Sequence, residues 1–169
     1  MNAVLAEWNS ADAEDALSAM MACCGARRWA AGMVALRPLN TIFELSEEAD
    51  RLWGTMAEPD WLEAFTCHPR IGERKAAHAT AQSAAWSRQE QSSVSSAQEQ
   101  VLAELTDGNA LYEQRFGFTF IVCATGKNAH EMLAILKQRL DNSRDVELHE
   151  AAEQQRQIMQ IRLGKWLMQ

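Results

Sequence analysis

A histidine, a proline and an arginine follow one another directly after an apolar helical turn, in the stretch F-T-C-H-P-R-I-G-E from Phe65 to Glu73. Proline disfavours the α conformation of the residue before it, so a helix in this region must stop at about Cys67 or His68. A histidine at a helix end can project its ring into a cleft, and its unperturbed pKa of about 6.5 suits proton transfer near neutral pH. Judged alone, His68 is more often a structural residue than a catalytic one.

Arg162 lies in line with apolar residues near the end of the chain. In a helix that begins at about Asp145, residues at steps of three and four share one face. Here that face comprises Leu148, Ala152, Gln155, Met159, Arg162 and Trp166. Either the stem of Arg162 packs while its guanidinium reaches water, or the guanidinium faces a pocket and binds a carboxylate or carbonyl oxygen. The pattern leaves both interpretations open.

Ser87 and Glu90 have the S-x-x-E spacing of a capping box, and capping is the interpretation that this pattern favours. His78, His130 and His149 lie among Ala, Lys and Glu residues and are expected at the surface. Neither the histidines nor the four cysteines have the spacing of a known metal site, so no metal is predicted. The tryptophans are expected in the core or in an interface. The polar run Lys137-Gln138-Arg139 is expected on a solvated helix face.

The composition predicts one soluble globular domain over residues 1–169. Hydrophobic residues make up 47% of the chain, and its net charge of −7 argues against a general nucleic-acid binder. The chain has no apolar run near the ~20 residues of a membrane span. Its N-terminus lacks the pattern of a signal peptide. A cytoplasmic protein without a membrane or nucleic-acid partner is the simplest expectation.

Most of the chain has helical spacing. Helices are predicted at 9–22, 26–36, 41–56, 60–68, 87–106, 109–116, 128–140 and from about 145 to near the end, with a loop or short helix at 71–85. A capping box, Asn128 to Glu131, opens the seventh of these. Residues 118–125 have the propensity of a strand but no partner strand, and are expected to be a buried extended or helix-entry segment. The predicted fold is all-α, a compact multi-helix domain with a pocket between helices.

Four ordered motifs resemble the family of 2-oxo-4-hydroxy-4-carboxy-5-ureidoimidazoline (OHCU) decarboxylases of purine catabolism. They are His68-Pro69-Arg70-Ile71-Gly72, Ser87-x-x-Glu90-Gln91, Phe116-Gly117-Phe118-x-Phe120-Ile121 and Glu153-x-x-Arg156-x-Ile158-x-x-Ile161-Arg162-Leu163. Cys23-Cys24-Gly25-x-x-Arg28-Trp29 and Asp60-Trp61-Leu62-x-Ala64-Phe65 are also similar to the family. After Gln91, where the family often continues with a small residue, Gly and Leu, this chain has Ser92-Ser93-Val94.

The resemblance implies an all-helical, commonly dimeric enzyme that converts OHCU to (S)-allantoin in urate degradation without a cofactor. It implies His68 as the catalytic histidine and Glu90 as a second catalytic residue. It further implies that the substrate is bound by Pro69, Ser87, Gln91, Phe118, Phe120, Ile121 and Arg162. Two alternatives stay open: a non-catalytic helical interaction module on the same scaffold, and a lyase that acts on a related ureide.

Overall fold

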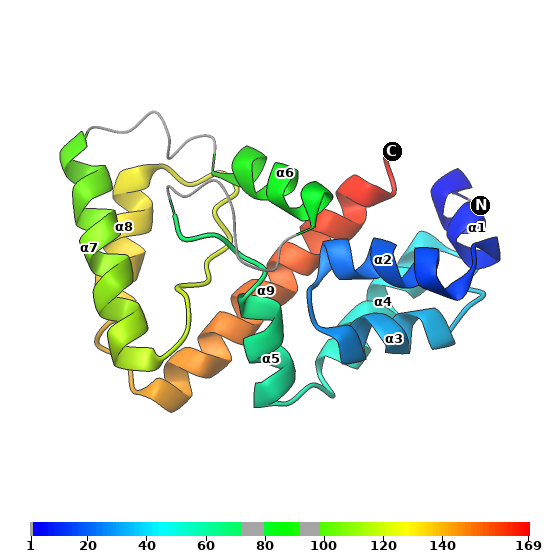
Figure 1. Ribbon diagram of the computed structural model, residues 1–169, viewed down its shortest axis with the longest axis horizontal. Helices are drawn as coiled ribbons and strands as arrows, with labels where there is room; N and C mark the ends of the chain where they lie inside the picture. Colours follow the sequence, from blue (N-terminus) through cyan, green and yellow to red (C-terminus); the bar gives the residue numbers. More distant parts are fainter. Residues whose placement is uncertain (1, 72–79, 92–98) are drawn as a thin grey trace. The chain divides into compact units, whose positions relative to one another are not determined.

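The computed structural model describes residues 2–71, 80–91 and 99–169, and every regular element within these ranges is a helix. Figure 1 shows them in chain order. The predicted all-α class is therefore confirmed. The helices are α1 (Ala3–Ser10), α2 (Ala13–Cys23), α3 (Arg27–Ala35), α4 (Ile42–Trp53), α5 (Glu58–Phe65), α6 (Ala81–Glu90), α7 (Glu99–Phe116), α8 (Ala129–Arg139) and α9 (Arg144–Trp166).

The chain divides into two compact units. The first comprises Met1–Ala64 and Arg156–Gln169, and the second comprises Phe65–Gln155. The long helix α9 contributes residues to each unit. The expectations of one domain over residues 1–169 and of a pocket between helices therefore stay predictions.

Tryptophans form much of the core of the first unit. Trp8, Trp29, Trp53 and Trp166 are all buried, and the rings of Trp8 and Trp166 meet edge to face with centroids 6.0 Å apart. A buried indole N–H needs an acceptor, and that of Trp29 donates to the carbonyl of Ala49 at 3.0 Å. For these four residues, the prediction of a core role is confirmed.

Polar contacts join α4 to the C-terminal half of α9 in the same unit. Asp50 accepts from Arg156 at 3.0 Å and from Gln160 at 2.8 Å. The hydroxyl of Ser46 donates to the side-chain oxygen of Gln160 at 2.8 Å. These bonds fix the rotation of the α9 segment that carries Arg162, two residues further along.

The predicted helix 9–22 is two helices. Asp12 caps α2 by accepting from the backbone N–H of Asp15 at 2.8 Å, so the chain breaks between α1 and α2. Asn9 lies in the last turn of α1, and its side chain both donates to and accepts from the backbone of Leu39, at 2.7 and 3.0 Å. The side chain of Asn9 thus links two distant segments and caps no helix. The local sequence does not distinguish these two roles of an asparagine.

The predicted boundary at Asp107-Gly108 was also wrong, because α7 continues through it to Phe116. A Cβ atom on Gly108 would lie 2.5 Å from Cδ2 of Leu136, so this glycine permits the close approach of α7 and α8. The helix stops at Gly117, whose φ of +81° few side chains adopt. Gly108 therefore serves the packing of α7 against α8, and Gly117 ends α7.

Several other boundaries match the predictions closely. The capping box at Asn128 and Glu131 is formed, and α8 ends one residue before Leu140. Helices α3 and α9 lie within about a residue of their predicted starts, whereas α4 ends at Trp53 rather than at 56. Helix α5 begins at Glu58 rather than at 60, so Asp60 is a first-turn residue, and its carboxylate accepts from the backbone N–H of Ala57 at 2.9 Å.

Candidate active site

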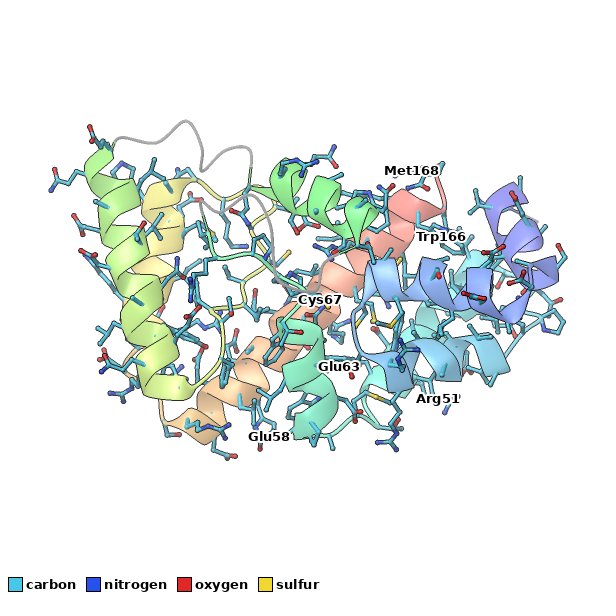
Figure 2. All side chains as sticks on the ribbon, viewed as in Figure 1. Arg51, Glu58, Glu63, Cys67, Trp166 and Met168 are labelled. Carbon is cyan, nitrogen blue, oxygen red and sulfur yellow. The ribbon has the colours of Figure 1, made fainter. Side chains whose placement is uncertain are left out.

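His68 lies in the turn that follows α5. The helix ends at Phe65, whose carbonyl accepts the backbone N–H of His68 at 3.2 Å. Cys67, the residue before His68, lies just beyond the end of the helix (Figure 2). The histidine is half-buried and Pro69 is buried. The predicted helix-end position of the histidine is confirmed, although the helix stops two residues earlier than Cys67.

The ring of His68 is held by a residue from α9. Its Nε2 atom lies 2.7 Å from Oε1 of Gln155, which has no exposed surface. Both residues belong to the second unit. A hydrogen bond to one ring nitrogen determines which nitrogen carries the proton in the neutral ring. Sequence reasoning placed Gln155 on the buried stripe of α9 but assigned it no role.

Arg70 fastens the chain just after His68 to α7. Its Nε and Nη2 atoms each lie 2.6 Å from an oxygen of Glu113, in the two-pronged geometry that matches guanidinium to carboxylate. The hydroxyl of Thr119 lies 3.5 Å from the same carboxylate. Half of the Arg70 side chain is exposed, so the pair contributes orientation more than stability.

Residues 118–124 form neither helix nor strand, and all of them except the half-buried Thr119 are buried. Phe118 packs against Phe65, with ring centroids 5.5 Å apart, three residues before His68. Phe118 and Phe120 both pack on Tyr112, at 5.8 and 5.2 Å. The expectation of a buried segment is confirmed for residues 118–124, which form no helix, whereas Thr125 lies exposed in a turn. The segment lies against the last residue of α5, which leads into the histidine turn.

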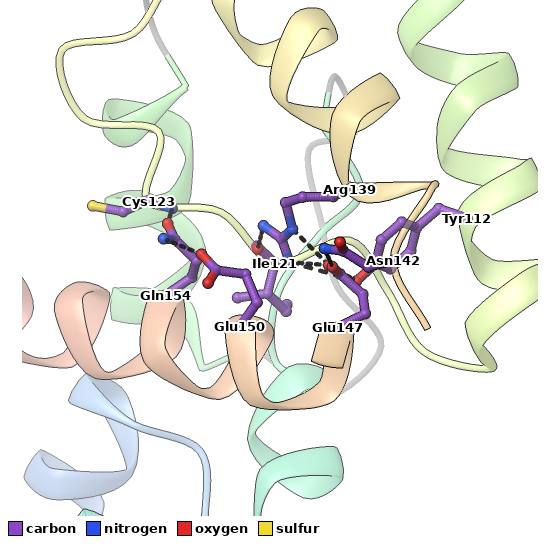
Figure 3. Close-up of polar contacts among 8 residues, drawn as sticks. All are labelled: Tyr112, Ile121, Cys123, Arg139, Asn142, Glu147, Glu150 and Gln154. Carbon is purple, nitrogen blue, oxygen red and sulfur yellow. Dashed lines mark hydrogen bonds and ion pairs between the residues drawn. The ribbon is translucent and has the colours of Figure 1, made fainter. Parts of the chain in front are cut away.

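Side chains of α8 and α9 satisfy the backbone of this segment in place of a partner strand (Figure 3). Arg139 donates to the carbonyl of Ile121 at 2.5 Å, and its guanidinium lies 4.7 Å from the ring centre of Phe120. The backbone N–H of Cys123 donates to Oε1 of Gln154 at 2.9 Å. Buried peptide groups need such partners, so these two side chains explain how strand-like residues remain extended in an all-helical protein.

Arg139 belongs to a buried charged cluster, shown in Figure 3. It forms an ion pair with Glu147, and the two side chains are 6% and 0% exposed. Glu147 also accepts from the hydroxyl of Tyr112 and from Asn142. Burial raises the pKa of Tyr112, so its phenol stays protonated and donates. The prediction that Arg139 lies on a solvated face was wrong. Its spacing from Met132 and Leu136, two buried residues of α8, was the signal that could have shown this.

Ser87 is a helix-interior residue, so its predicted role as an N-cap was wrong. The cap of α6 is Thr80, whose hydroxyl accepts from the backbone N–H of Ser83 at 3.0 Å. Ser87 is buried, while Glu90 and Gln91 at the end of the helix are half-buried. Positions three and four apart lie on one helical face, so Ser87, Glu90 and Gln91 form a polar group on one side of α6.

Arg162 is buried, with 2% of its surface exposed, as are the other five members of its stripe on α9. The interpretation in which the guanidinium of Arg162 reaches water is therefore wrong. Burial raises the pKa of the Cys23 thiol, and the positive charge of Arg162 opposes that shift. The guanidinium thus acts electrostatically on the buried end of α2. Arg162 belongs to the first unit and the other predicted site residues to the second, so its membership of the site stays a prediction.

The remaining predictions for polar residues have mixed outcomes. His130 and His149 are exposed as expected, and the four cysteines are buried and form no disulfide with one another. His78, Gly72 and 92–94 lie outside the described residues. Among the residues that are described, no three His, Cys, Asp or Glu side chains gather as metal ligands do. None of the described helices is both long and apolar enough to cross a membrane.

A family model described as OHCU decarboxylase matches residues 9–164. The chain belongs to the OHCU decarboxylase family. It is 37% identical over 144 residues to the uric acid degradation bifunctional protein TTL of Arabidopsis thaliana. The aligned region covers 85% of this chain and 44% of the plant protein. It is 27% identical over 129 residues to the OHCU decarboxylase of Haloferax volcanii. That alignment covers 76% of this chain and 74% of the Haloferax protein. The chain thus spans less than half the length of the plant protein.

Solved structures of similar fold agree with this family. A crystal structure of OHCU decarboxylase in the presence of (S)-allantoin has a TM-score of 0.76 and 35% sequence identity, covering 88% of this chain and 96% of that one. A crystal structure of (S)-allantoin synthase, at 18% identity and a TM-score of 0.70, is similar in fold alone. The helical fold described above is therefore that of the OHCU decarboxylase family.

Proposed function

We propose that this protein decarboxylates OHCU to (S)-allantoin in the degradation of urate, without a cofactor. The observation that carries the proposal is the half-buried His68, which follows α5 and whose ring is hydrogen-bonded to Gln155 of α9. This histidine lies in a chain of the OHCU decarboxylase family. A similar protein was crystallised in the presence of (S)-allantoin. A positioned imidazole suits a reaction that needs orientation and one controlled proton transfer.

The substrate itself supplies the electron sink that decarboxylation requires. When the bond to the carboxylate breaks and carbon dioxide leaves, its electron pair moves toward the C=N bond beside the reacting carbon. The hydroxyl on that carbon then loses its proton as a ring carbonyl forms. The nitrogen of the former C=N bond takes a proton from solvent. The neighbouring carbon gains a second proton and becomes the stereocentre of allantoin. The protein must therefore orient the carboxylate, accept one proton and deliver another to a single face.

Under this proposal His68 is the proton-handling residue and Glu90 is its catalytic partner. Glu90 either holds the ureido N–H groups or polarises the imidazole. Arg162 binds a ring or carboxylate oxygen through its planar fork of donors. Ser87 and Gln91 line the site from α6. Pro69 and the segment containing Phe118, Phe120 and Ile121 form a wall, with backbone groups that can bind a ureide.

We also propose that the protein acts as a homodimer, as the family resemblance implies, and that it does so in the cytoplasm. Its acidic balance, with a net charge of −7, supports the absence of a nucleic-acid partner. Light scattering after size-exclusion chromatography tests the dimer. A mass equal to one chain of 18.9 kDa at micromolar concentration would contradict it.

The function is tested by adding the protein to freshly generated OHCU and following the circular dichroism of the product. Because OHCU also decays in water, the spontaneous product should be racemic, whereas protonation on one face gives allantoin of one hand. His68→Ala should keep its fold and lose roughly 10²- to 10⁴-fold in rate. The matched control is His130→Ala, which removes an exposed histidine of α8 and should keep both rate and handedness.

Two outcomes would contradict the proposal. A dichroism signal equal to that of the enzyme-free reaction, with wild-type protein present, would favour the non-catalytic interaction module. Single-handed product from a different ureide, with OHCU untouched, would favour a related lyase.

A further inference from the structure

Gln155 contacts the ring of His68 directly. It lies on the buried face of α9 with none of its surface exposed. Its Oε1 atom is 2.7 Å from Nε2 of His68, although the two residues are 87 positions apart in the chain. A wholly buried amide has no freedom to turn toward water, so it holds the imidazole in a defined plane.

The nitrogen at the other end of this amide has no acceptor among the residues that the structure describes. Among the described residues, Nε2 of Gln155 has no hydrogen-bond partner, although it is buried. Folded proteins pair nearly all such donors, and an unpaired one calls for a specific explanation. The nitrogen is part of the same planar group as the oxygen that contacts His68, so an acceptor that pairs with it must lie close to the imidazole.

We propose that Gln155 links His68 to the substrate through both ends of its amide. Its oxygen accepts the Nε2–H of the imidazole and makes Gln155 a positioning residue for His68. Its nitrogen donates to a carboxylate or carbonyl oxygen of the bound substrate. This inference rests on the proposed function, because it takes His68 as the group that transfers protons.

The hydrogen bond has a defined consequence for the proton chemistry. If Nε2 carries the proton that Gln155 accepts, Nδ1 holds the lone pair of the neutral ring. Nδ1 is then the atom that takes a proton from the substrate and returns one to it. The amide oxygen can accept from Nε2–H in both the neutral and the protonated ring, so the orientation persists through the cycle.

Two substitutions separate the roles of the amide. Gln155→Glu keeps an acceptor for His68 but removes the donor and adds a negative charge. Gln155→Met keeps the approximate length and removes both polar ends. The matched controls are Gln138→Glu and Gln138→Met, which make the same chemical changes at an exposed position of α8.

The primary measurement is ¹⁵N NMR of the histidine rings, with the His68 signals assigned by their loss in His68→Ala. We expect the proton on Nε2 in the neutral wild-type ring. Gln155→Glu should keep this tautomer and raise the titration midpoint of His68 by about one pH unit or more, because an opposite charge favours the imidazolium. Gln155→Met should lose the tautomer preference, whereas both Gln138 variants should match the wild type.

The kinetic measurement tests the donor. Loss of one hydrogen bond to substrate should raise KM for OHCU about 3- to 10-fold in Gln155→Met, with a fall in kcat from the released imidazole. Gln155→Glu should keep more of its kcat at its own pH optimum but have a high KM, because a carboxylate repels the substrate anion. If Gln155 were merely structural, the neutral ring of His68 would keep the same tautomer in Gln155→Met as in the wild type.

The proposal is overturned if the neutral wild-type ring carries its proton on Nδ1. It is also overturned if Gln155→Met matches the wild type in ring signals, titration midpoint and KM. Failure of the wild-type protein to convert OHCU refutes the proposed function instead. The ring measurement is made without substrate, so it still decides whether Gln155 positions His68.

Discussion

Removing the positive charge of Arg139 should destabilise the protein strongly. In Arg139→Met the carboxylate of Glu147, which is 0% exposed, loses its ion-pair partner. The carbonyl of Ile121 loses the donor that lies 2.5 Å away. Methionine retains most of the length of the arginine stem, so packing against Phe120 is largely kept. The substitution therefore tests the charge and the hydrogen bonds more than the volume.

The expected magnitude follows from this burial. Breaking a buried ion pair by removing one partner costs about 3–5 kcal/mol, because the remaining charge is left without compensation. Natural domains have a total stability of only about 5–15 kcal/mol. For a chain of this size such a loss lowers the melting temperature by roughly 10 °C. The extended segment that Arg139 holds should also loosen, so activity should fall even at temperatures where the protein stays folded.

The assay is urea unfolding at neutral pH, followed by circular dichroism. The double variant Arg139→Met with Glu147→Gln should recover about 2 kcal/mol, because the amide still accepts from Tyr112 but carries no charge. Lys137→Met is the matched control on the same helix. Lys137 pairs with Glu104 at 3.0 Å, with 63% of its side chain exposed, so the unfolding midpoint should hardly change.

The reasoning would be refuted if Arg139→Met cost less than about 1 kcal/mol, the scale of a surface ion pair. It would also be refuted if the double variant were less stable than Arg139→Met. In that case the cost would come from lost packing and not from an unpaired carboxylate.

Three further predictions follow from the structure. Arg162→Ala should raise KM for OHCU more than it lowers kcat, and Arg162→Lys should rescue poorly because an ammonium lacks the planar fork; full rescue by lysine would argue against bidentate binding. Tyr112 is the only tyrosine of the chain, and burial raises its pKa above the usual value of about 10. Its stabilising effect should therefore be complete below pH ~10 and be lost as the pH rises further, and near-ultraviolet absorbance should show no phenolate until unfolding begins; phenolate forming near pH 10 in folded protein would contradict this. Dialysis against a chelator should leave OHCU turnover unchanged, and loss of activity that one metal restores would overturn the cofactor-free proposal.

Local and periodic features were predictable from the sequence because they depend on residues close together in the chain. The stripe from Leu148 to Trp166 follows from the helical repeat alone, and all six of its members are buried. The capping box at Asn128 follows from two residues three positions apart. The position of His68 after a helix follows from the effect of Pro69 on the preceding backbone. These elements supply the all-α class and most of the candidate site residues.

The partners of the polar residues were decided only by the tertiary structure. Nothing local distinguishes Thr80 from Ser87 as the cap of α6, because each hydroxyl has a suitable sequence around it. The burial of Arg139 depends on Glu147, which belongs to a different helix. Gln155 is one polar residue of an apolar stripe until folding brings it within 2.7 Å of His68. Periodicity shows which face of a helix is buried, but a hydrogen bond between distant segments depends on how helices pack, and that is determined by the whole chain.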